Sequence, residues 1–510
     1  MSPNNTSRKP RVAIVGGAIG GCLTALALRD IASTIVVIER AANLSEMDLD
    51  LGGGGITLFT NSVDLLSRSD LVQPGGLTAE SLRVPSNAQT IVLREWYSGK
   101  ETNRIEAPGE HWSLHRRTFI TKLYELVEQQ GRSEGDHNAQ VEFIWNVNVR
   151  PEDVDTLAGT VKVGNERVVK ADIIVGADGV KSAVRRAILR ASGFGTPKSV
   201  PIGFSVIRFN QPDSCLSQET RRLMNLQDCS KPSQGERFQG EQIAVVHGPF
   251  MRSVHYRIRD DGLLNSVVYI PDDIVLRDRP GLGRSWRSQV DGEFMNSLVD
   301  KHYAPMLPGM ADMYRQADGA GVWQLRSMPA LPTWSHGKAI IIGDAAHPMA
   351  PFQGSGTSMV IEDIEALRLL LKQSLAGPPA MDEAIRNTFD SVYKVRFLRA
   401  SIVQTISDRT PFQRDVLDQK QRASLEMEGN PNNMGSLILN EDGMPLHEAY
   451  SKARKRVEEA VEAERLDLDS PIIVQWAMVY TNADEWQKSK ESLILDDEHD
   501  LWRKDGPSRT

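Results

Sequence analysis

A glycine-rich turn near the N-terminus constrains the fold more than any other feature of the sequence. Residues 11–15 (RVAIV) form a short apolar run, and residues 16–21 (GGAIGG) follow it directly. Residues 22–29 are typical of a helix, and residues 34–39 (TIVVIE) are typical of a second buried strand. A strand, turn, helix and strand within about 30 residues predict a βαβ unit with two parallel strands. Because both strands are apolar throughout, we expect both faces of the sheet to be covered.

The glycine turn has the spacing of a dinucleotide-binding fingerprint. Gly16 permits the tight turn and Gly21 permits close packing of helix against strand, whereas Ala18 stands where the pattern has its second glycine. The N–H groups at the start of the next helix favour a phosphate. Glu39, at the end of the second strand, is placed to accept the ribose hydroxyls of an adenosine. These residues favour FAD or NAD over NADP, and a glycine turn without a ligand is the simpler alternative.

Two later strands also end in glycine and aspartate. Residues 171–175 precede a GADG segment that contains Asp178, and residues 339–342 precede Gly343 and Asp344. Because ligands bind at the carboxyl ends of parallel strands in α/β sheets, we expect the Asp344 carboxylate at a binding edge. Residues 354–356 (GSG) then begin a further helix, which has its own N–H donors for an anionic or electron-rich group.

The pattern changes between residues 202 and 325. Four segments there alternate apolar and polar residues or carry aromatic residues, which predicts an antiparallel sheet inserted into the first domain. These segments are residues 204–209, 242–247, 252–258 and 265–270. After Ser358 the apolar residues take helical spacing. We expect helices over residues 360–373, 382–406 and 447–463.

Composition narrows the possible functions. The 59 Lys and Arg residues against 67 Asp and Glu give a net charge of −8, so no basic surplus points to nucleic acid. The three cysteines exclude a disulfide framework, a four-cysteine zinc site and a CxxC redox pair, and we expect no metal. With no secretory signal and no long apolar run, we expect a cytoplasmic protein without an integral membrane segment. The oligomeric state stays open.

Three motifs, in this order, resemble the group A flavoprotein monooxygenases. They are the glycine turn with Glu39, the DG pair at Asp178 within DIIVGADGVKSAVRR, and residues 343–363 (GDAAHPMAPFQGSGTSMVIED). This family contains the aromatic hydroxylases of the p-hydroxybenzoate and salicylate hydroxylase type and their fungal relatives. The resemblance covers roughly residues 10–410 and implies FAD as the cofactor, with NADPH or NADH as the electron donor.

The resemblance also implies individual FAD contacts, beside those of Gly16, Gly21 and Asp178. Glu39 would hold the adenosine ribose, and Gly54 would lie beside the flavin. Arg116, in LHRRTF, matches an arginine near the cofactor, and Asp344 matches the aspartate at the ribityl chain. Thr357 matches a small residue of the glycine turn, although the family has alanine there. As alternatives, Arg116 makes a surface ion pair and the glycines around Gly54 form a flexible turn.

Two residues of the inserted sheet match family positions that face the substrate over the flavin. Arg208 lies in an apolar strand, where a charge is costly unless it is paired. Tyr256 matches a tyrosine that is followed by proline in the family and by Arg257 here. We expect Arg208 to steady the hydroperoxide or a phenolate and Tyr256 to hydrogen-bond the substrate. The alternative is a structural ion pair for Arg208 and core packing for Tyr256.

Two histidines near these residues are weaker candidates. His347 follows the GD motif and is either a proton shuttle or a helix-start residue that bonds to backbone. His255 is expected to point to the opposite sheet face from Tyr256.

The resemblance therefore implies an FAD-dependent monooxygenase. It would use NAD(P)H and O2 to hydroxylate an aromatic or polycyclic small molecule, through a C4a-hydroperoxyflavin, with secondary metabolism as one setting. Epoxidation and Baeyer–Villiger oxidation use the same chemistry and stay open, as does the choice between NADH and NADPH. A missing WxWxIP segment disfavours a halogenase. The intact Asp344 disfavours a non-catalytic escort protein of prenylated GTPases.

The expected fold class is α/β. We expect a Rossmann-like FAD-binding domain of the glutathione-reductase type, an inserted and mostly antiparallel substrate sheet, and a helical C-terminus. The FAD-binding part would comprise residues 1–80, 111–200 and 326–380. The substrate sheet would comprise residues 81–110 and 201–325, and the helical region residues 381–510.

Overall fold

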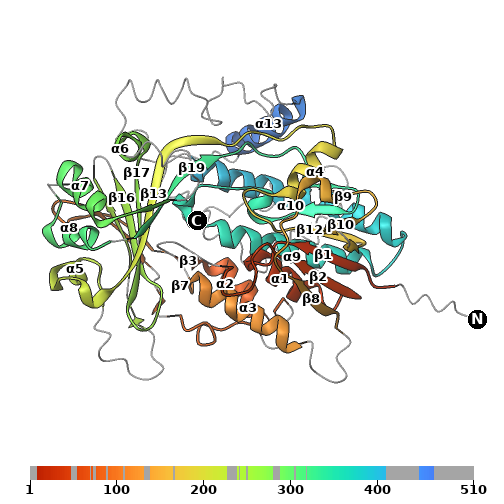
Figure 1. Ribbon diagram of the computed structural model, residues 1–510, viewed down its shortest axis with the longest axis horizontal. Coiled ribbons are helices and arrows are strands. Elements are labelled where there is room, and N and C mark those ends of the chain that lie inside the picture. Colours follow the sequence, from red (N-terminus) through yellow and green to blue (C-terminus); the bar gives the residue numbers. More distant parts are fainter. Residues whose placement is uncertain are drawn as a thin grey trace, which may run out of the picture.

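The structure is a computed structural model, and the statements below concern the residues that it describes. These are residues 8–47, 54–68, 71–72, 76–84, 86–87, 90–106, 109–130, 138–164, 167–226, 238–239, 242–248, 251–278, 288–303, 306–317, 319–408 and 447–463. Two large sheets lie at opposite ends of the molecule, with most of the long helices around one of them (Figure 1). The expected mixed α/β class is confirmed.

The first sheet has six strands, and neighbouring strands run parallel except at the β20–β21 pair. β1 lies between β2 and β12, so the first βαβ unit forms the centre of this sheet. In sheet order the strands are β20 (Ser335–His336), β21 (Ala339–Ile341), β12 (Ile173–Gly176), β1 (Arg11–Val15), β2 (Thr34–Ile38) and β8 (Gln140–Ile144).

Both faces of this sheet are buried. Val12 and Ile14 of β1 pack into a core with the helices on one face, whereas Ala13 and Val15 pack into a second core on the other face. This is why the strand is apolar at every position. The first core includes α1 (Ile19–Leu28), α3 (Arg116–Gln130) and α9 (Gly356–Ser374). The second includes α4 (Ala183–Ala191) and a small sheet of β9 (Val154–Asp155), β10 (Thr160–Val163) and β11 (Arg167–Lys170).

The second sheet has eight strands and is antiparallel except where β5 pairs with β15. In sheet order they are β18 (Ser288–Val290), β19 (Ala320–Ser327), β13 (Val200–Pro212), β17 (Leu263–Pro271), β16 (Arg252–Arg257), β15 (Gln242–His247), β5 (Thr90–Glu95) and β6 (Glu101–Glu106). The helices α7 (Gly292–His302) and α8 (Pro308–Arg315) cover one face, and α5 (Gln218–Leu223) and α6 (Asp272–Asp278) lie near its margins (Figure 1).

The other face of the second sheet is turned toward a short connecting layer. That layer comprises β3 (Gly55–Leu58), β7 (Trp112–His115) and α2 (Thr60–Ser67) (Figure 1). Phe59, which follows β3, packs with Tyr256 and Ile243 of the sheet. A further two-stranded pair joins β4 (Ser86–Asn87) to β14 (Phe238–Gln239). The connecting layer thus lies between the second sheet and the first sheet (Figure 1).

Three helices follow the last motif, where helical spacing was expected. They are α9, α10 (Met381–Asp408) and α13 (Glu448–Ala463). α9 begins at Gly356, so Glu362 and Asp363 lie in its second turn and not at its start. α13 has one buried stripe, and Ala453 and Val457 pack against Phe397 of α10. Among the described helices, none is long and apolar enough to cross a membrane.

The C-terminal end of α10 carries a buried carboxyl group. The Oδ2 atom of Asp408 accepts a hydrogen bond from the Ser327 hydroxyl at the end of β19. Its Oδ1 atom accepts a hydrogen bond from the backbone N–H of Ala350 at 3.4 Å. Burial raises the pKa of Asp408 to about 7, and these two hydrogen bonds oppose the shift only in part.

We expect this group to make the stability of the protein depend on pH. The unfolded-state pKa of an aspartate is about 3.9, so between that value and about 7 the folded state binds the proton more tightly. The stabilisation by protonated Asp408 is therefore complete below the pKa that the residue has in the unfolded state. It is lost as the pH rises through the pKa of the folded state. Asp408→Asn stays neutral, so its stability relative to wild type should increase by about 1.4 kcal/mol per pH unit across this window.

Urea unfolding midpoints of the two proteins, measured from about pH 5 to about pH 8, test this expectation. Asp390→Asn is the control, because Asp390 is an exposed residue of the same helix. Parallel pH profiles for wild type and Asp408→Asn would show that Asp408 does not titrate in this range.

Candidate active site

Four motif segments meet at one edge of the parallel sheet. β1, β2, β12 and β21 lead directly into the segments of Gly16, Glu39, Asp178 and Asp344. These strands are neighbours and run in the same direction, so their carboxyl ends lie side by side. This is the edge at which α/β sheets bind ligands.

The glycine turn is compact enough to require glycine at two positions. Gly16 has a φ of +99°, and a Cβ atom there would lie 2.4 Å from the carbonyl oxygen of Ala177. A Cβ atom on Gly21 would lie 1.9 Å from the carbonyl oxygen of Gly16. Helix α1 begins just after Ala18, whose side chain makes no capping hydrogen bond. The first N–H groups of α1 therefore suit an anionic ligand such as a pyrophosphate.

Glu39 lies at the carboxyl edge of the sheet, and its carboxylate stabilises the glycine turn by hydrogen bonds. Its Oε2 atom accepts a hydrogen bond from the Gly17 N–H at 2.7 Å, and its Oε1 atom accepts one from the Ala41 N–H at 2.9 Å. A carboxylate has further lone pairs on each oxygen, which a ribose could use. The neighbouring Cys22 is buried, and burial together with the Glu39 charge raises the pKa of its thiol to about 12. Cys22 therefore stays protonated and is no thiolate nucleophile.

Asp344 lies at the same edge, beside several cationic side chains. The residue is exposed, and desolvation by the surrounding protein raises the pKa of its carboxyl. The positive charges of His347, Arg116 and Arg185 lower the same pKa. Asp344 therefore lies at this edge within electrostatic reach of Arg116. Such a setting fits the polar ribityl chain of FAD, because a carboxylate accepts hydrogen bonds from hydroxyl groups.

The structure also brings Gly54 to Arg116. The Arg116 backbone N–H, at the start of α3, donates a hydrogen bond to the Gly54 carbonyl oxygen. This contact extends the pairing of β3 with β7, in which Gly55 lies opposite His115. Residues 51–53, the earlier part of the glycine run, lie outside the described residues. Gly54, Arg116 and Asp344 thus form one neighbourhood at the junction with the connecting layer.

Asp178 has a structural role at the same edge. Its Oδ1 atom accepts a hydrogen bond from the Ser182 hydroxyl at 2.5 Å, and its Oδ2 atom accepts one from the Ala183 N–H at 2.6 Å. The Asp178 carboxylate therefore caps α4, although burial still raises its pKa. Thr357 is half-buried in the first turn of α9, and a Cβ atom on Gly356 would meet no atom within 4 Å. The start of α9 therefore borders open space.

Arg208 and Tyr256 share one face of the second sheet. Arg208 lies opposite Val267 of β17, and Tyr256 lies opposite Asn265, two residues earlier on the same strand. Directly opposed residues of antiparallel strands point to the same face, as do residues two apart. The Arg208 guanidinium lies 5.5 Å from the centre of the Trp323 ring. No ion pair of Arg208 with a carboxylate occurs among the described residues, and its buried Nε has no hydrogen-bond partner there.

The Tyr256 hydroxyl points toward the connecting layer. A Cβ atom on Gly55 would lie 2.8 Å from this oxygen, which places the phenol one residue from Gly54. Burial raises the pKa of Tyr256, whereas the Arg208 charge and a hydrogen bond with Thr57 lower it. The phenol therefore stays protonated at neutral pH and can donate a hydrogen bond.

Sequence reasoning missed Tyr269 and its neighbours on this face. The Tyr269 hydroxyl donates a hydrogen bond to the Pro351 carbonyl oxygen at 3.4 Å, and its ring lies 4.5 Å from that of Phe352. Burial raises the pKa of Tyr269 to about 12. Arg252 lies directly opposite Tyr269 on β16. The available signal was the alternation of residues 265, 267 and 269, which puts Tyr269 on the face of Arg208.

His255 lies on the other face, as expected. Its Nδ1 atom is 3.0 Å from the Ser266 hydroxyl, and its Nε2 atom is 2.8 Å from the Ser253 hydroxyl. Burial lowers the pKa of His255 to about 3, so the ring is neutral. It is therefore a core residue under α8, where its ring lies 6.1 Å from that of Tyr314.

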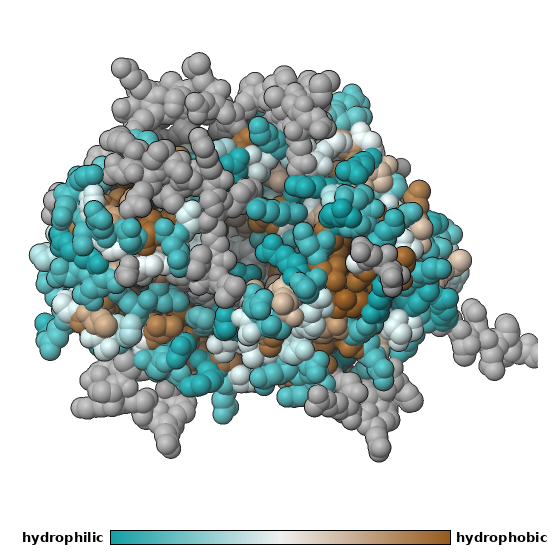
Figure 2. Space-filling view, in the orientation of Figure 1, coloured by the Kyte–Doolittle hydropathy of each residue, from teal (hydrophilic) through white to brown (hydrophobic). Residues whose placement is uncertain are grey.

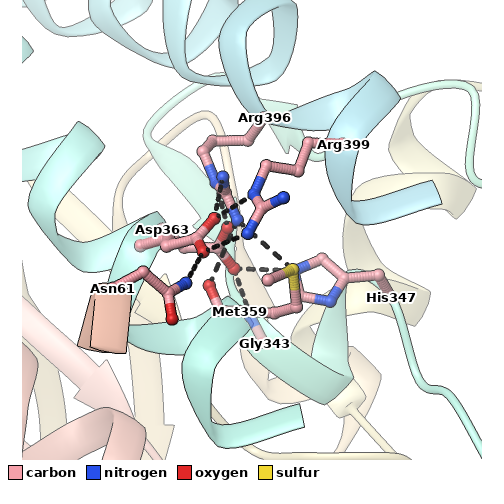
Figure 3. Close-up of polar contacts among 8 residues, drawn as sticks. Asn61, Gly343, His347, Met359, Asp363, Arg396 and Arg399 are labelled. Carbon is pink, nitrogen blue, oxygen red and sulfur yellow. Dashed lines mark hydrogen bonds and ion pairs between the residues drawn. The ribbon is translucent and has the colours of Figure 1, made fainter. Parts of the chain in front are cut away.

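A buried ionic network lies behind the Asp344 turn (Figure 3). Glu362 and Asp363 of α9 face Arg396 and Arg399 of α10, and none of the four is more than 3% exposed. His347 joins this network through Asp363, so its side chain bonds a carboxylate and not the backbone. The sequence shows an acidic pair and two helical arginines 33 to 37 positions later, and no local spacing connects them.

The comparisons with known proteins agree with this site. Residues 9–235 match the family of FAD binding domains. The FAD-dependent monooxygenase ntnJ of Nectria sp is 27% identical over 364 residues, which is 71% of this chain and 76% of that protein. Salicylate hydroxylase from Pseudomonas putida is 26% identical over 406 residues, covering 76% of this chain and 83% of that protein.

Solved structures show the same fold. A salicylate hydroxylase substrate complex has a TM-score of 0.57 at 21% identity and covers 94% of this chain and 100% of that chain. HpxO from Klebsiella pneumoniae, complexed with FAD and uric acid, has a TM-score of 0.58 at 15% identity, covering 91% of this chain and 97% of that chain. The expected cofactor FAD and the expected class of enzyme are confirmed. Over most of its length the chain is thus similar to FAD-dependent monooxygenases, and its residues 9–235 match the FAD binding domain.

Proposed function

We propose that this enzyme hydroxylates an aromatic or polycyclic small molecule, with NAD(P)H as the electron donor and O2 as the oxidant. The observation that supports this most is the shared face of Arg208, Tyr256 and Tyr269, which reaches the Gly54–Asp344 neighbourhood through β3. Relatives named salicylate hydroxylase and 6-hydroxynicotinate 3-monooxygenase support an aromatic substrate.

In this proposal the two sheets have different roles. The parallel sheet and its helices hold FAD at the carboxyl edge, and the eight-stranded sheet holds the substrate. Bound FAD, once reduced by NAD(P)H, supplies the electrons and the activation of O2. Gly16, Gly21 and Glu39 hold its adenosine half, and Asp344 with Arg116 holds its ribityl chain. Gly54 and Thr357 border the ring, and Asp178 contributes by capping α4 beside the pyrophosphate.

The chain's own residues position and polarise the substrate. The Arg208 guanidinium stabilises negative charge on a phenolate oxygen, because no carboxylate among the described residues neutralises it. The protonated Tyr256 hydroxyl donates a hydrogen bond to the same substrate. Trp323, Tyr269 and Phe352 form aromatic walls that exclude water and hold a flat ring.

The proposed cofactor contact of Asp344 can be tested by FAD binding. We expect Asp344→Ala to weaken FAD binding about tenfold or more, because a charge-assisted hydrogen bond contributes about 1.5–3 kcal/mol. Flavin fluorescence of the full-length protein, titrated with FAD, gives the dissociation constant. Asp390→Ala, on the exposed side of α10, should bind FAD as wild type does. An unchanged affinity in Asp344→Ala would contradict the assignment of this site.

The role of Tyr256 can be tested with a matched pair of variants. Tyr256→Phe keeps the ring and removes only the hydroxyl, so we expect kcat/KM for a phenolic substrate to fall about tenfold. Hydrogen peroxide formation per NAD(P)H consumed should rise, because the substrate is held less firmly. Tyr303→Phe is the control, since the buried Tyr303 hydroxyl has no hydrogen-bond partner among the described residues and lies in the core under α7 and α8. Equal effects of the two variants would contradict the proposal.

The reaction itself is tested by screening phenols, indoles and polyketides for faster NAD(P)H oxidation. Mass spectrometry with isotopically labelled O2 should show one labelled oxygen on an aromatic carbon of the product. A lactone as the product would indicate Baeyer–Villiger oxidation, and an epoxide would indicate epoxidation. Either product would contradict hydroxylation.

A further inference from the structure

One carboxylate connects the FAD-binding edge to a helix far away in the sequence. The Oδ2 atom of Asp363 accepts hydrogen bonds from the Gly343 N–H at 2.9 Å and from His347 Nε2 at 2.7 Å. Its Oδ1 atom accepts a hydrogen bond from Arg396 Nε of α10 at 2.8 Å (Figure 3). Asp363 is fully buried. The Asp363 side chain thus holds Gly343 and His347, which flank Asp344 in the turn, and connects them to α10.

The protonation states in this unit follow from the contacts. Burial raises the pKa of Asp363, but His347 and Arg396 outweigh it and lower the pKa to about 2. The ionised carboxylate can only accept hydrogen bonds, so His347 must donate through its Nε2 atom. Among the described residues, the buried Nδ1 atom of His347 has no hydrogen-bond partner.

The same contacts hold the Asp344 turn without using the Asp344 carboxylate. The Gly343 carbonyl oxygen accepts hydrogen bonds from the Ala346 and His347 N–H groups, each at 2.8 Å. The carbonyl oxygen of Asp344 itself accepts one from Arg185 at 3.3 Å. Both ends of the turn are therefore anchored by buried groups. None of these contacts uses the Asp344 carboxylate, so it stays available for a ligand while its backbone is anchored.

Glu362, the adjacent residue, has a different set of partners. Its carboxylate accepts hydrogen bonds from Asn61 of α2 at 2.5 Å and from Arg399 of α10 at 2.7 Å, and it also pairs with Arg396. None of its hydrogen bonds reaches Gly343 or His347. Glu362 therefore joins helices, whereas Asp363 joins a helix to the turn. The two residues have similar burial and charge, which makes them a natural matched pair.

We propose that Asp363, together with His347 and Arg396, is a positioning unit that sets the affinity for FAD by aiming the Asp344 carboxylate. This inference rests on the proposed contact of Asp344 with FAD. Asp363 itself touches no cofactor atom in this proposal, and it acts through the turn. α10 thereby takes part in cofactor binding, although it lies outside the glycine-turn segment of the sequence.

The first test compares Asp363→Asn with Glu362→Gln in the full-length protein. We expect Asp363→Asn to weaken FAD binding about tenfold more than Glu362→Gln does. Urea unfolding midpoints measured without added FAD should fall by similar amounts in both variants, because each leaves a buried arginine partly unpaired and no ligand then contributes to the stability. Equal losses of FAD affinity in the two variants would overturn the proposal, since the role would then be structural.

The second test replaces His347 and does not disturb the buried ion pairs. His347→Gln keeps a nitrogen donor close to the Nε2 position, whereas His347→Leu has similar bulk and no donor. We expect wild-type FAD affinity for His347→Gln and about tenfold weaker binding for His347→Leu. Equal affinities of these two variants would overturn the proposal.

A double variant separates this inference from the proposed role of Asp344. If Asp363 acts through Asp344, Asp344→Ala with Asp363→Asn should bind FAD no more weakly than Asp344→Ala alone. Additive losses would overturn the inference. If Asp344→Ala alone binds FAD normally, the proposed cofactor site is wrong. If Asp344→Ala binds FAD weakly and Asp363→Asn binds it normally, the proposed cofactor site is supported and the proposed positioning unit is wrong.

Discussion

The parallel pairing of β1 between β2 and β12 determines where the functional groups of this protein can lie. Because the three strands run in one direction, their carboxyl ends bring Gly16, Glu39 and Asp178 to one edge. The segments that follow β1 and β12 approach so closely that Gly16 has no room for a side chain. β21 then adds Asp344 to the same edge, from a part of the sequence more than three hundred residues away. The proposed cofactor site thus depends on sheet order as much as on any single residue.

One buried face of the second sheet carries a few polar side chains among apolar ones. Arg208, Tyr256 and Tyr269 lie on that face because residues two apart on a strand point the same way. The opposite face packs against α7 and α8, where His255 and Tyr303 are core residues. A monooxygenase needs its substrate dry and close to the flavin, and the short β3 strand links this face to the Gly54 neighbourhood.

Much of this arrangement could be predicted from the sequence, because it depends on local patterns. Continuous apolarity in residues 11–15 indicated a strand covered on both faces, and alternation in residues 265–270 indicated a sheet with two different faces. Tyr269 was missed although the same alternation places it on the face of Arg208. The partners of Asp363 were missed for another reason. Arg396 meets Asp363 only through the packing of α9 on α10, which a single sequence does not reveal.

β5 and β6 enter the second sheet from a point in the chain that precedes β12, whereas β13, β15, β16, β17 and β19 come after it. The chain therefore crosses between the two sheets repeatedly, and neither sheet is made by one continuous segment. A fragment that began at β13 would leave the β15 edge without β5, exposing a row of unpaired backbone groups. The six-stranded and the eight-stranded sheet therefore cannot be separated by a single cut in the chain.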